Sequence, residues 1–161
     1  IYNIKYIYMN IENKIKKQKI PRKYIPKYLT KKDKLKQYKE IMRSKKMYKK
    51  RKYHVRDKIK SFKTKKSKHK SKFMKMYNLK EEELKLSKIS NKTRCKKKGL
   101  KKIINKGMGA YYSSGSRPNQ TPYSWGVARL YSALTGGPAS KIDKKILLEN
   151  CKKNSKIIEL L

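Results

Sequence analysis

Positive charge without internal compensation dominates the first two thirds of this chain. Residues 1–106 carry 41 lysines and arginines against 7 aspartates and glutamates, whereas residues 107–161 carry 8 against 3. A segment this charged and this poor in apolar residues buries too little surface to offset its ordering entropy, so much of residues 10–80 is expected to be mobile on its own. The sequence therefore predicts a basic arm over residues 1–78 and a small folded domain over residues 79–161.

Apolar spacing predicts a mainly α fold, with a small helical C-terminal domain around a Gly/Ser-rich central loop and an extended, partly helical arm before it. One helix is expected over 31–48, where Thr30 and Asp33 resemble a capping box, and another over 68–77. A third is expected over about 81–90, because its three leading glutamates suit a helix N-terminus.

Three further helices are expected in the C-terminal domain. One runs from Lys96 and stops at Gly107, one begins at Pro122 after a Thr121 cap, and one begins near Ser140. Residues 83–92 and 96–106 outline either a helix-turn-helix or a plain helical hairpin, with Arg94 where such turns often carry glycine. The expected core consists of Trp125, Leu130, Leu134, Ile146 and Leu147.

Cysteine, histidine and apolar content give no sign of a metal site, a cofactor or a membrane span. Cys95 and Cys151 have no second cysteine or histidine at ligand spacing, and we expect two reduced thiols in an intracellular protein. No apolar run approaches the roughly 20 residues that a membrane span needs. Met9 is the expected start of translation.

Pro21 and Pro26, interleaved with tyrosine and isoleucine, are expected to form an extended docking peptide.

A glycine- and serine-rich segment, 107–125, is chemically unlike its surroundings. Residues 107–140 hold six of the seven glycines and only two cations. Three interpretations are open: a structural clasp, a phosphate cradle in which Arg117 grips the anion, and a small enzyme acting on a phosphate-bearing substrate through Arg117 and a loop serine. The residues concerned are Gly109, Ser113, Ser114, Ser116, Arg117, Asn119 and Gln120. A serine nucleophile lacks a neighbouring base in this stretch, so we expect no enzyme.

The run Gly109-Ala-Tyr-Tyr-Ser-Ser-Gly-Ser-Arg-Pro-Asn-Gln-Thr121, with Ser124-Trp125, Ala128-Arg129 and Thr135-Gly136-Gly137 after it, resembles an uncharacterised domain of short lysine-rich proteins. Such proteins occur in large DNA viruses of algae and protists, with relatives in tailed phages. The resemblance covers most of residues 21–151, although relatives often carry Thr-Gly-Cys where this chain has Thr93-Arg94-Cys95. It implies a viral source and assigns no activity.

Charge and resemblance together favour a non-enzymatic viral protein that binds nucleic acid non-specifically, DNA in the first place and RNA in the second. Tyrosines interleaved with the lysines, such as Tyr48 and Tyr53, either stack on single-strand bases or pack internally. The expected contacts are Lys45, Lys46, Lys49, Lys50, Arg51, Lys52, Arg56, Lys65, Lys66 and Lys68. The alternative is a minor virion component that threads between acidic capsid surfaces. Either role places the protein in the virion or in the viral replication compartment of the host cell, not outside it.

Overall fold

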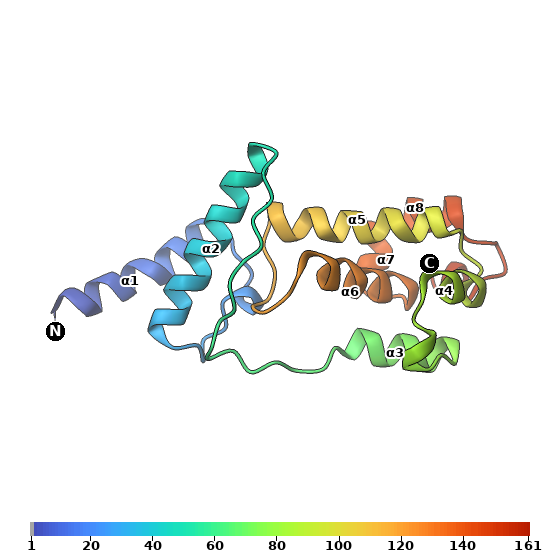
Figure 1. Cartoon of the computed structure of the whole chain (residues 1–161), viewed down its shortest axis with the longest axis horizontal. Helices are drawn as coiled ribbons and strands as arrows, with labels where there is room; N and C mark the ends of the chain where they lie inside the picture. Colours follow the sequence, from blue (N-terminus) through green and yellow to red (C-terminus); the bar gives the residue numbers. More distant parts are fainter. Residues whose placement is uncertain (1) are drawn as a thin grey trace. The chain divides into compact units, whose positions relative to one another are not determined.

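The computed structural model describes residues 2–161, with side chains described from Asn10 onward (Figure 1). Met9, the expected start of translation, lies outside the described side chains. The described chain is mainly helical and has no strands, as the sequence predicts. Its helices are α1 (Tyr2–Lys17), α2 (Lys31–Lys49), α3 (Lys68–Tyr77), α4 (Leu86–Thr93), α5 (Lys97–Ser113), α6 (Pro122–Leu134), α7 (Pro138–Ile142), α8 (Lys144–Asn150) and α9 (Lys156–Glu159).

The chain divides into two compact units, and each contains two separate segments of the sequence. Unit 1 comprises Ile1–Thr64 and Ala110–Thr121, whereas unit 2 comprises Lys65–Gly109 and Pro122–Leu161. This division differs from the expected boundary at 78/79, which falls inside unit 2 after α3. The expected basic arm is therefore split between the units, and most of the glycine-serine segment belongs to the same unit as the N-terminal residues.

Unit 1 has an apolar core of its own, built from residues of the predicted basic arm. Seven aliphatic side chains from separate segments are buried together: Ile11, Ile15, Ile20, Ile25, Leu29, Ile41 and Ile59. Ile25 and Leu29 come from the proline-containing segment, which packs into this core and is not a free docking peptide. Burying an isoleucine or leucine contributes roughly 1.5–3 kcal/mol, which gives even this charged unit a means of folding.

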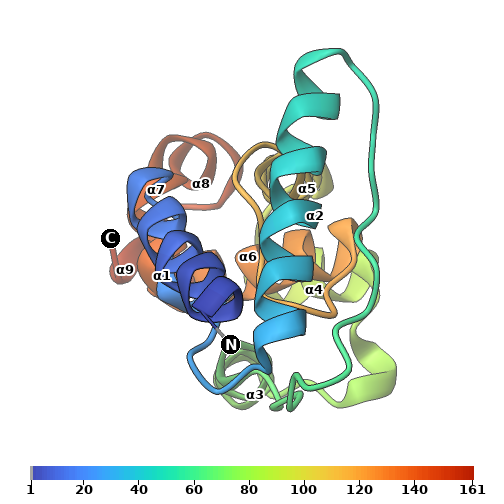
Figure 2. The same cartoon turned by 90° about the vertical axis from the view of Figure 1, so that its left-hand side faces the viewer.

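Helix α2 begins where the sequence predicts and is followed by a chain reversal. Thr30 caps it, because the Thr30 hydroxyl accepts a hydrogen bond from the main-chain N–H of Asp33 at 3.3 Å. The Asp33 carboxylate does not complete a capping box and instead accepts from the main-chain N–H of Ser61 at 2.8 Å. After α2 the backbone turns through Arg51, at φ 58°, and residues 53–60 return beside the helix (Figures 1 and 2).

Unit 2 is built around α6, which packs against α3 on one side and α5 on another (Figure 1). Its core includes the predicted Leu130, Leu134 and Leu147, while Ile146 is partly buried against it and Trp125 lies outside the cluster. The contact between α5 and α6 depends on glycine, because a Cβ on Gly126 would lie 2.5 Å from the carbonyl oxygen of Ile104. These two helices approach each other backbone to backbone.

Several predicted helices have different limits in the structure. Helix α3 has the predicted bounds, and α6 begins at Pro122 as predicted. The helix predicted over 81–90 is instead a 3₁₀ turn at Glu81–Glu83 followed by α4. Helix α5 does not stop at Gly107 but continues to Ser113, so the first part of the predicted central loop is helical. The predicted last helix is divided at Asp143 into α7 and α8.

Candidate functional site

The face of α2 that packs against the rest of unit 1 carries polar side chains among its apolar ones. Gln37, Ile41 and Ser44 are all almost completely buried, and their spacing places them on one side of the helix. The Gln37 amide nitrogen donates to the carbonyl oxygens of Tyr24 and Ser116, at 3.2 and 3.3 Å. The Ser44 hydroxyl donates to the carbonyl of Tyr112 at 3.2 Å. These contacts, which we did not predict, fasten residues 110–121 to α2.

Arg56 occupies the centre of these contacts and is only 9% exposed. Its guanidinium donates to the Tyr111 carbonyl at 2.8 Å, to the Ser116 hydroxyl at 2.6 Å and to the Ser44 hydroxyl at 3.2 Å. The same group lies over the Tyr111 ring, with Cζ 3.6 Å from the ring centroid. Burial lowers the pKa of Arg56, yet a guanidinium stays protonated in proteins. A buried cation is thus held by neutral oxygens and an aromatic ring.

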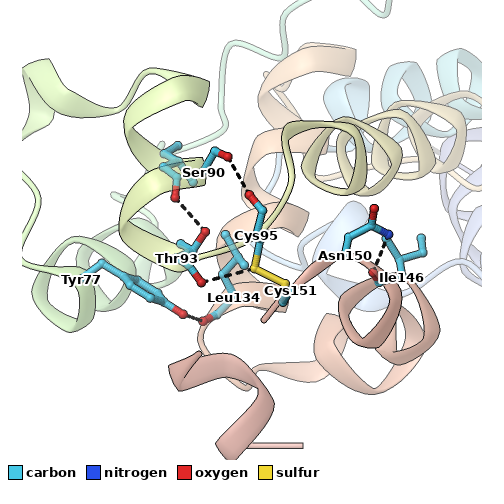
Figure 3. The surroundings of a disulfide bond; sticks show 9 residues. Tyr77, Ser90, Thr93, Cys95, Leu134, Ile146, Asn150 and Cys151 are labelled. Carbon is cyan, nitrogen blue, oxygen red and sulfur yellow. Dashed lines mark hydrogen bonds between the residues drawn. A yellow bond between two sulfur atoms is a disulfide. The ribbon is translucent and has the colours of Figure 1, made fainter. Parts of the chain in front are cut away.

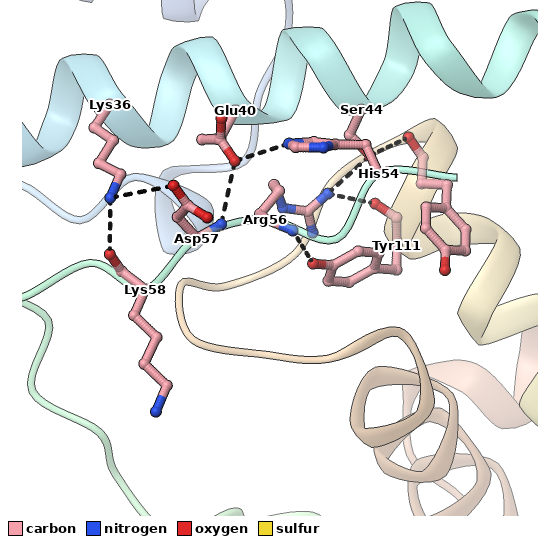
Figure 4. A network of polar contacts seen from close by, with 9 residues as sticks. Lys36, Glu40, Ser44, His54, Arg56, Asp57, Lys58 and Tyr111 are labelled. Carbon is pink, nitrogen blue, oxygen red and sulfur yellow. Dashed lines mark hydrogen bonds and ion pairs between the residues drawn. The ribbon is translucent and has the colours of Figure 1, made fainter. Parts of the chain in front are cut away.

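Glu40 fixes the extended segment beside α2 through two further contacts, which Figure 4 shows. Its carboxylate lies 2.8 Å from His54 Nε2 and accepts from the main-chain N–H of Asp57 at 3.1 Å. Burial alone would raise the pKa of Glu40, but the hydrogen bonds from His54 and Asp57 outweigh burial and hold the pKa below its ordinary value. Glu40 is therefore an ionised anchor of this segment.

Two residues of the glycine-serine motif, Asn119 and Gly115, lie against other segments of unit 1. Asn119, at φ 60°, accepts from the main-chain N–H of Ile59 at 2.7 Å and donates to the Ile59 carbonyl at 3.2 Å. Gly115 adopts φ 101°, and a Cβ there would lie 3.2 Å from Ile41. These two positions require the left-handed backbone that glycine and asparagine tolerate best.

The remaining motif residues differ in their unit and in their exposure. Gly109 lies in the part of α5 that belongs to unit 2. Ser113, Ser114 and Arg117 are exposed, Gln120 is half-buried, and Ser116 is buried with its hydroxyl donating to the carbonyl of Arg117 at 2.8 Å. We call the contacts of Tyr111, Ser116 and Asn119 with residues 56–59 the clasp.

Three tyrosine rings gather where the chain reverses after α2. Tyr48 and Tyr112 are stacked, with centroids 5.8 Å apart and planes 12° apart. Tyr53 packs its edge on Tyr112 at 5.1 Å and lies 6.0 Å from Tyr48, yet remains 66% exposed. We call these three residues the tyrosine cluster. Tyr112 was not predicted to take part, since only the fold brings it next to residues so distant in sequence.

Six of the ten predicted nucleic-acid contacts lie in the same part of the chain as Tyr48 and Tyr53, at the end of α2 and in the turn after it. All six are exposed except Lys45, which is half-buried, and we call them the basic turn: Lys45, Lys46, Lys49, Lys50, Arg51 and Lys52. The prediction that Arg56 contacts nucleic acid is wrong, because its guanidinium is buried in the clasp and is not available to an external phosphate. The other three, Lys65, Lys66 and Lys68, are exposed and belong to unit 2.

In unit 2 a buried carboxylate joins three helices. Asp143, between α7 and α8, accepts two hydrogen bonds from Arg129 at 2.7 and 2.9 Å and one from Lys106 at 2.6 Å. Burial alone would raise the pKa of Asp143, but its bonds with Arg129 and Lys106 outweigh burial and lower the pKa. The carboxylate of Asp143 and its two cationic partners therefore satisfy one another within unit 2.

Cys95 and Cys151 form a disulfide bond, so the prediction of two reduced thiols is wrong (Figure 3). Two main-chain hydrogen bonds flank it, from Lys96 to Asn150 at 2.7 Å and from Lys152 to Arg94 at 3.0 Å. The spacing of the two cysteines gave no sign of this pairing, which depends on the return of α8 beside the start of α5. Disulfides persist where conditions are oxidising, so the cysteines no longer argue for an intracellular location.

The described residues contain neither a cluster of metal ligands nor a helix that could span a membrane. No group of three or more His, Cys, Asp and Glu side chains is placed there to hold a metal ion. None of the helices described combines the length and apolar character that a membrane crossing requires.

Comparison with known proteins gives a family and nothing finer. No curated protein and no solved structure matches the chain. The model of a family described as "Family of unknown function (DUF5824)" matches residues 13–147, a segment that includes α2, the basic turn, the clasp and Asp143. Because the match extends over most of the sequence, this chain belongs to the family of unknown function DUF5824.

Proposed function

We propose that this protein binds nucleic acid non-specifically through the basic turn and catalyses no reaction. The observation that carries the proposal is uncompensated charge at one place. Residues 41–56 contain eight lysines and arginines and no acidic residue, and all of these cations except Arg56 are exposed or half-exposed. A polyanion is the partner that such a surface attracts most strongly, because each neutralised phosphate releases a counterion.

The acids of unit 1 are engaged elsewhere and leave the basic turn uncompensated. Glu12 pairs with Arg22 at 2.6 Å, Asp57 lies 3.6 Å from Lys36, and Glu40 contacts His54. Asp33 accepts from the main chain of Ser61. Lysine contacts to phosphates fix position but read no sequence, so the binding is expected to be non-specific.

The clasp supports this proposal by holding the basic turn in place. The six cations of the basic turn repel one another. Contacts of Glu40, Ser44 and the motif hold the neighbouring chain in place against that repulsion. The resemblance to lysine-rich proteins of large DNA viruses supports DNA as the first partner to test, and the virion or the viral replication compartment as the setting.

The test is binding of the full chain to a labelled 20-base-pair duplex over a salt series. A variant with all six cations of the basic turn changed to glutamine is compared with the wild type. The matched control loses six exposed lysines from α4, α5 and the turn between them: Lys92, Lys96, Lys97, Lys98, Lys101 and Lys102. Both variants carry the same net charge, so only the location of the cations differs.

We expect the basic-turn variant to lose up to about five units of the slope of log affinity against log salt, at about 0.9 per phosphate contact. The control is expected to lose less than half as much. A larger loss in the control would assign the interface to the lysine-rich α5, as in a helix-turn-helix. A wild-type chain that binds both this duplex and a 20-base single strand weakly, with shallow slopes, would overturn the proposal in favour of a virion component lying between acidic capsid surfaces.

A further inference from the structure

An exposed tyrosine, Tyr53, directly follows the cations of the basic turn in the sequence. Binding of phosphates by charge does not require an aromatic residue at this position. Tyr53 is 66% exposed, and its neighbour Val55 is 55% exposed. His54 and Arg56, which alternate with them, turn toward α2 and are half-buried and buried. This alternation is typical of an extended segment, and it places the Tyr53 ring on the outer side of unit 1 next to Arg51 and Lys52.

The Tyr53 ring is held in place by its neighbours. It packs on Tyr112 and Tyr48, whose stacked rings fix it from behind. Tyr112 is itself tied to α2 through the hydrogen bond from Ser44 to its carbonyl. An aromatic ring that is already ordered loses little conformational freedom when a ligand packs on it, which favours binding.

We infer that Tyr53 is a stacking platform for an unpaired base, so that single-stranded nucleic acid is the preferred partner of the basic turn. The inference rests on the proposed function and names its partner more closely. Every base has a flat aromatic face, and a single strand exposes that face while a duplex hides it between neighbouring pairs. The cations hold the phosphates of the strand, and the ring of Tyr53 takes a base that lies between them.

Acidic groups near the platform do not oppose this arrangement. Asp57 is the exposed acid closest to Tyr53 in the same segment, and its carboxylate lies 3.6 Å from the ammonium group of Lys36. Glu40 is engaged with His54. The nearest acids are thus paired, and the cations of the basic turn are left to the phosphates of the strand.

The experiment measures affinity at one fixed salt concentration for four 20-unit ligands. They are oligo-dT, oligo-U, an abasic DNA strand and a DNA duplex. The proteins are the wild type, Tyr53→Ser, Tyr53→Phe and the control Tyr123→Ser, which removes a 63% exposed tyrosine from α6. The abasic strand carries phosphates without bases, so it separates stacking from charge.

We expect Tyr53→Ser to weaken binding to oligo-dT and oligo-U by about tenfold, the usual cost of losing one stacked base. Affinity for the abasic strand and for the duplex should stay within about twofold in every variant. Tyr53→Phe keeps the ring and should bind as the wild type does, and so should Tyr123→Ser. Tighter binding of the wild type to oligo-U than to oligo-dT would identify RNA as the preferred single strand.

Two other results would overturn the inference, and they are distinguishable from failure of the proposed function. If the wild type binds all four ligands equally and Tyr53→Ser changes none of them, the protein binds phosphates but no bases. If Tyr53→Ser weakens the abasic strand as much as oligo-dT, the tyrosine supports the cations and does not stack. Failure of the wild type to bind any ligand would instead refute the proposed function itself.

Discussion

Arg56 and Tyr111 hold each other through three different groups. The main-chain N–H of Arg56 donates to the Tyr111 hydroxyl at 2.9 Å, its guanidinium donates to the Tyr111 carbonyl at 2.8 Å, and the same guanidinium lies over the Tyr111 ring. Both residues are buried in unit 1. A cation that sequence alone assigns to an external phosphate is therefore part of the interior.

Replacing Arg56 by methionine should lower the free energy of unfolding by about 3 kcal/mol. The change keeps an apolar stem but removes the donors to the Tyr111 carbonyl and the Ser116 hydroxyl, and buried groups left without partners cost about 1–3 kcal/mol each. Urea denaturation followed by far-ultraviolet circular dichroism measures the change. The control Arg43→Met, an exposed position of α2, should stay within about 0.5 kcal/mol of the wild type. Equal effects at both positions would contradict the clasp.

Asp143→Asn should destabilise the protein at pH 7 by about 3 kcal/mol, because Arg129 and Lys106 lose their buried anion. The pKa of Asp143 is lowered in the folded state. Its contribution to stability is therefore complete above the ordinary aspartate pKa of about 3.9, and it is lost as pH falls through the lowered pKa. The gap between variant and wild type should narrow below about pH 4.

Thermal unfolding at pH 7, 5, 4 and 3 tests this pH dependence. Glu149→Gln, which removes an exposed acid on α8, is the control and should change stability by less than about 0.5 kcal/mol at each pH. A gap that stays constant down to pH 3 would show that Asp143 acts by packing rather than by charge.

Removing the disulfide with Cys95→Ser and Cys151→Ser should lower the free energy of unfolding by about 4 kcal/mol, from the loop-entropy relation. The two cysteines are 56 residues apart in sequence, so the bond restrains a long loop of the unfolded chain. Dithiothreitol should lower the urea midpoint of the wild type to that of the double variant and leave the variant unchanged. Thiol titration of the unreduced, denatured wild type should find no free thiol; two would refute the bond.

Gly126→Ala should destabilise unit 2 by about 2 kcal/mol, although alanine is the better helix former. The new methyl group would meet the Ile104 carbonyl oxygen at 2.5 Å, and helices α5 and α6 would have to separate. Thermal unfolding compares it with Tyr123→Ala, an exposed change on the same helix that should stay within about 0.5 kcal/mol. A stabilised Gly126→Ala variant would mean that the helices can move apart at no cost.

Arg94→Gly should raise the free energy of unfolding by about 1 kcal/mol. Arg94 ends α4 in the left-handed conformation, at φ 56°, where glycine meets no penalty from a side chain. Lys92→Gly inside the same helix should instead lower stability by about 1 kcal/mol. Opposite signs for these two substitutions, measured by urea denaturation, are the expected result, and a common sign would show that the turn does not constrain Arg94.

Local signals in the sequence predicted the elements that local contacts determine. The Thr30 cap predicted the start of α2, the Thr121-Pro122 pair predicted the start of α6, and the bounds predicted for the helix over 68–77 are those of α3. The basic turn could also be predicted, because a run of lysines and arginines without acids is visible in the sequence alone. These features need no knowledge of distant residues.

Features that depend on distant residues were missed. Helix α5 continues through Gly107, and this glycine packs closely against α6. A Cβ on Gly107 would lie only 2.6 Å from the Cα of Gly126, a contact between residues that are distant in sequence. The core of unit 1 takes its isoleucines and leucines from several segments, so no single stretch shows a periodic pattern. Gln37 and Ser44 offered one sign in the sequence that another segment packs on α2. They share a helical face with the apolar Ile41, and polar side chains on a buried face need hydrogen-bond partners.

The interleaving of the two units has a consequence for the nascent chain. Arg56 precedes Tyr111 by 55 residues, so at about 5–20 residues per second the ribosome needs roughly 3–11 s to supply its partner. By then all of the first segment of unit 2, Lys65–Gly109, has been synthesised. Unit 1 therefore cannot complete its fold before synthesis of unit 2 is under way. Until Tyr111 is synthesised, the guanidinium of Arg56 remains in water as one more cation beside the basic turn.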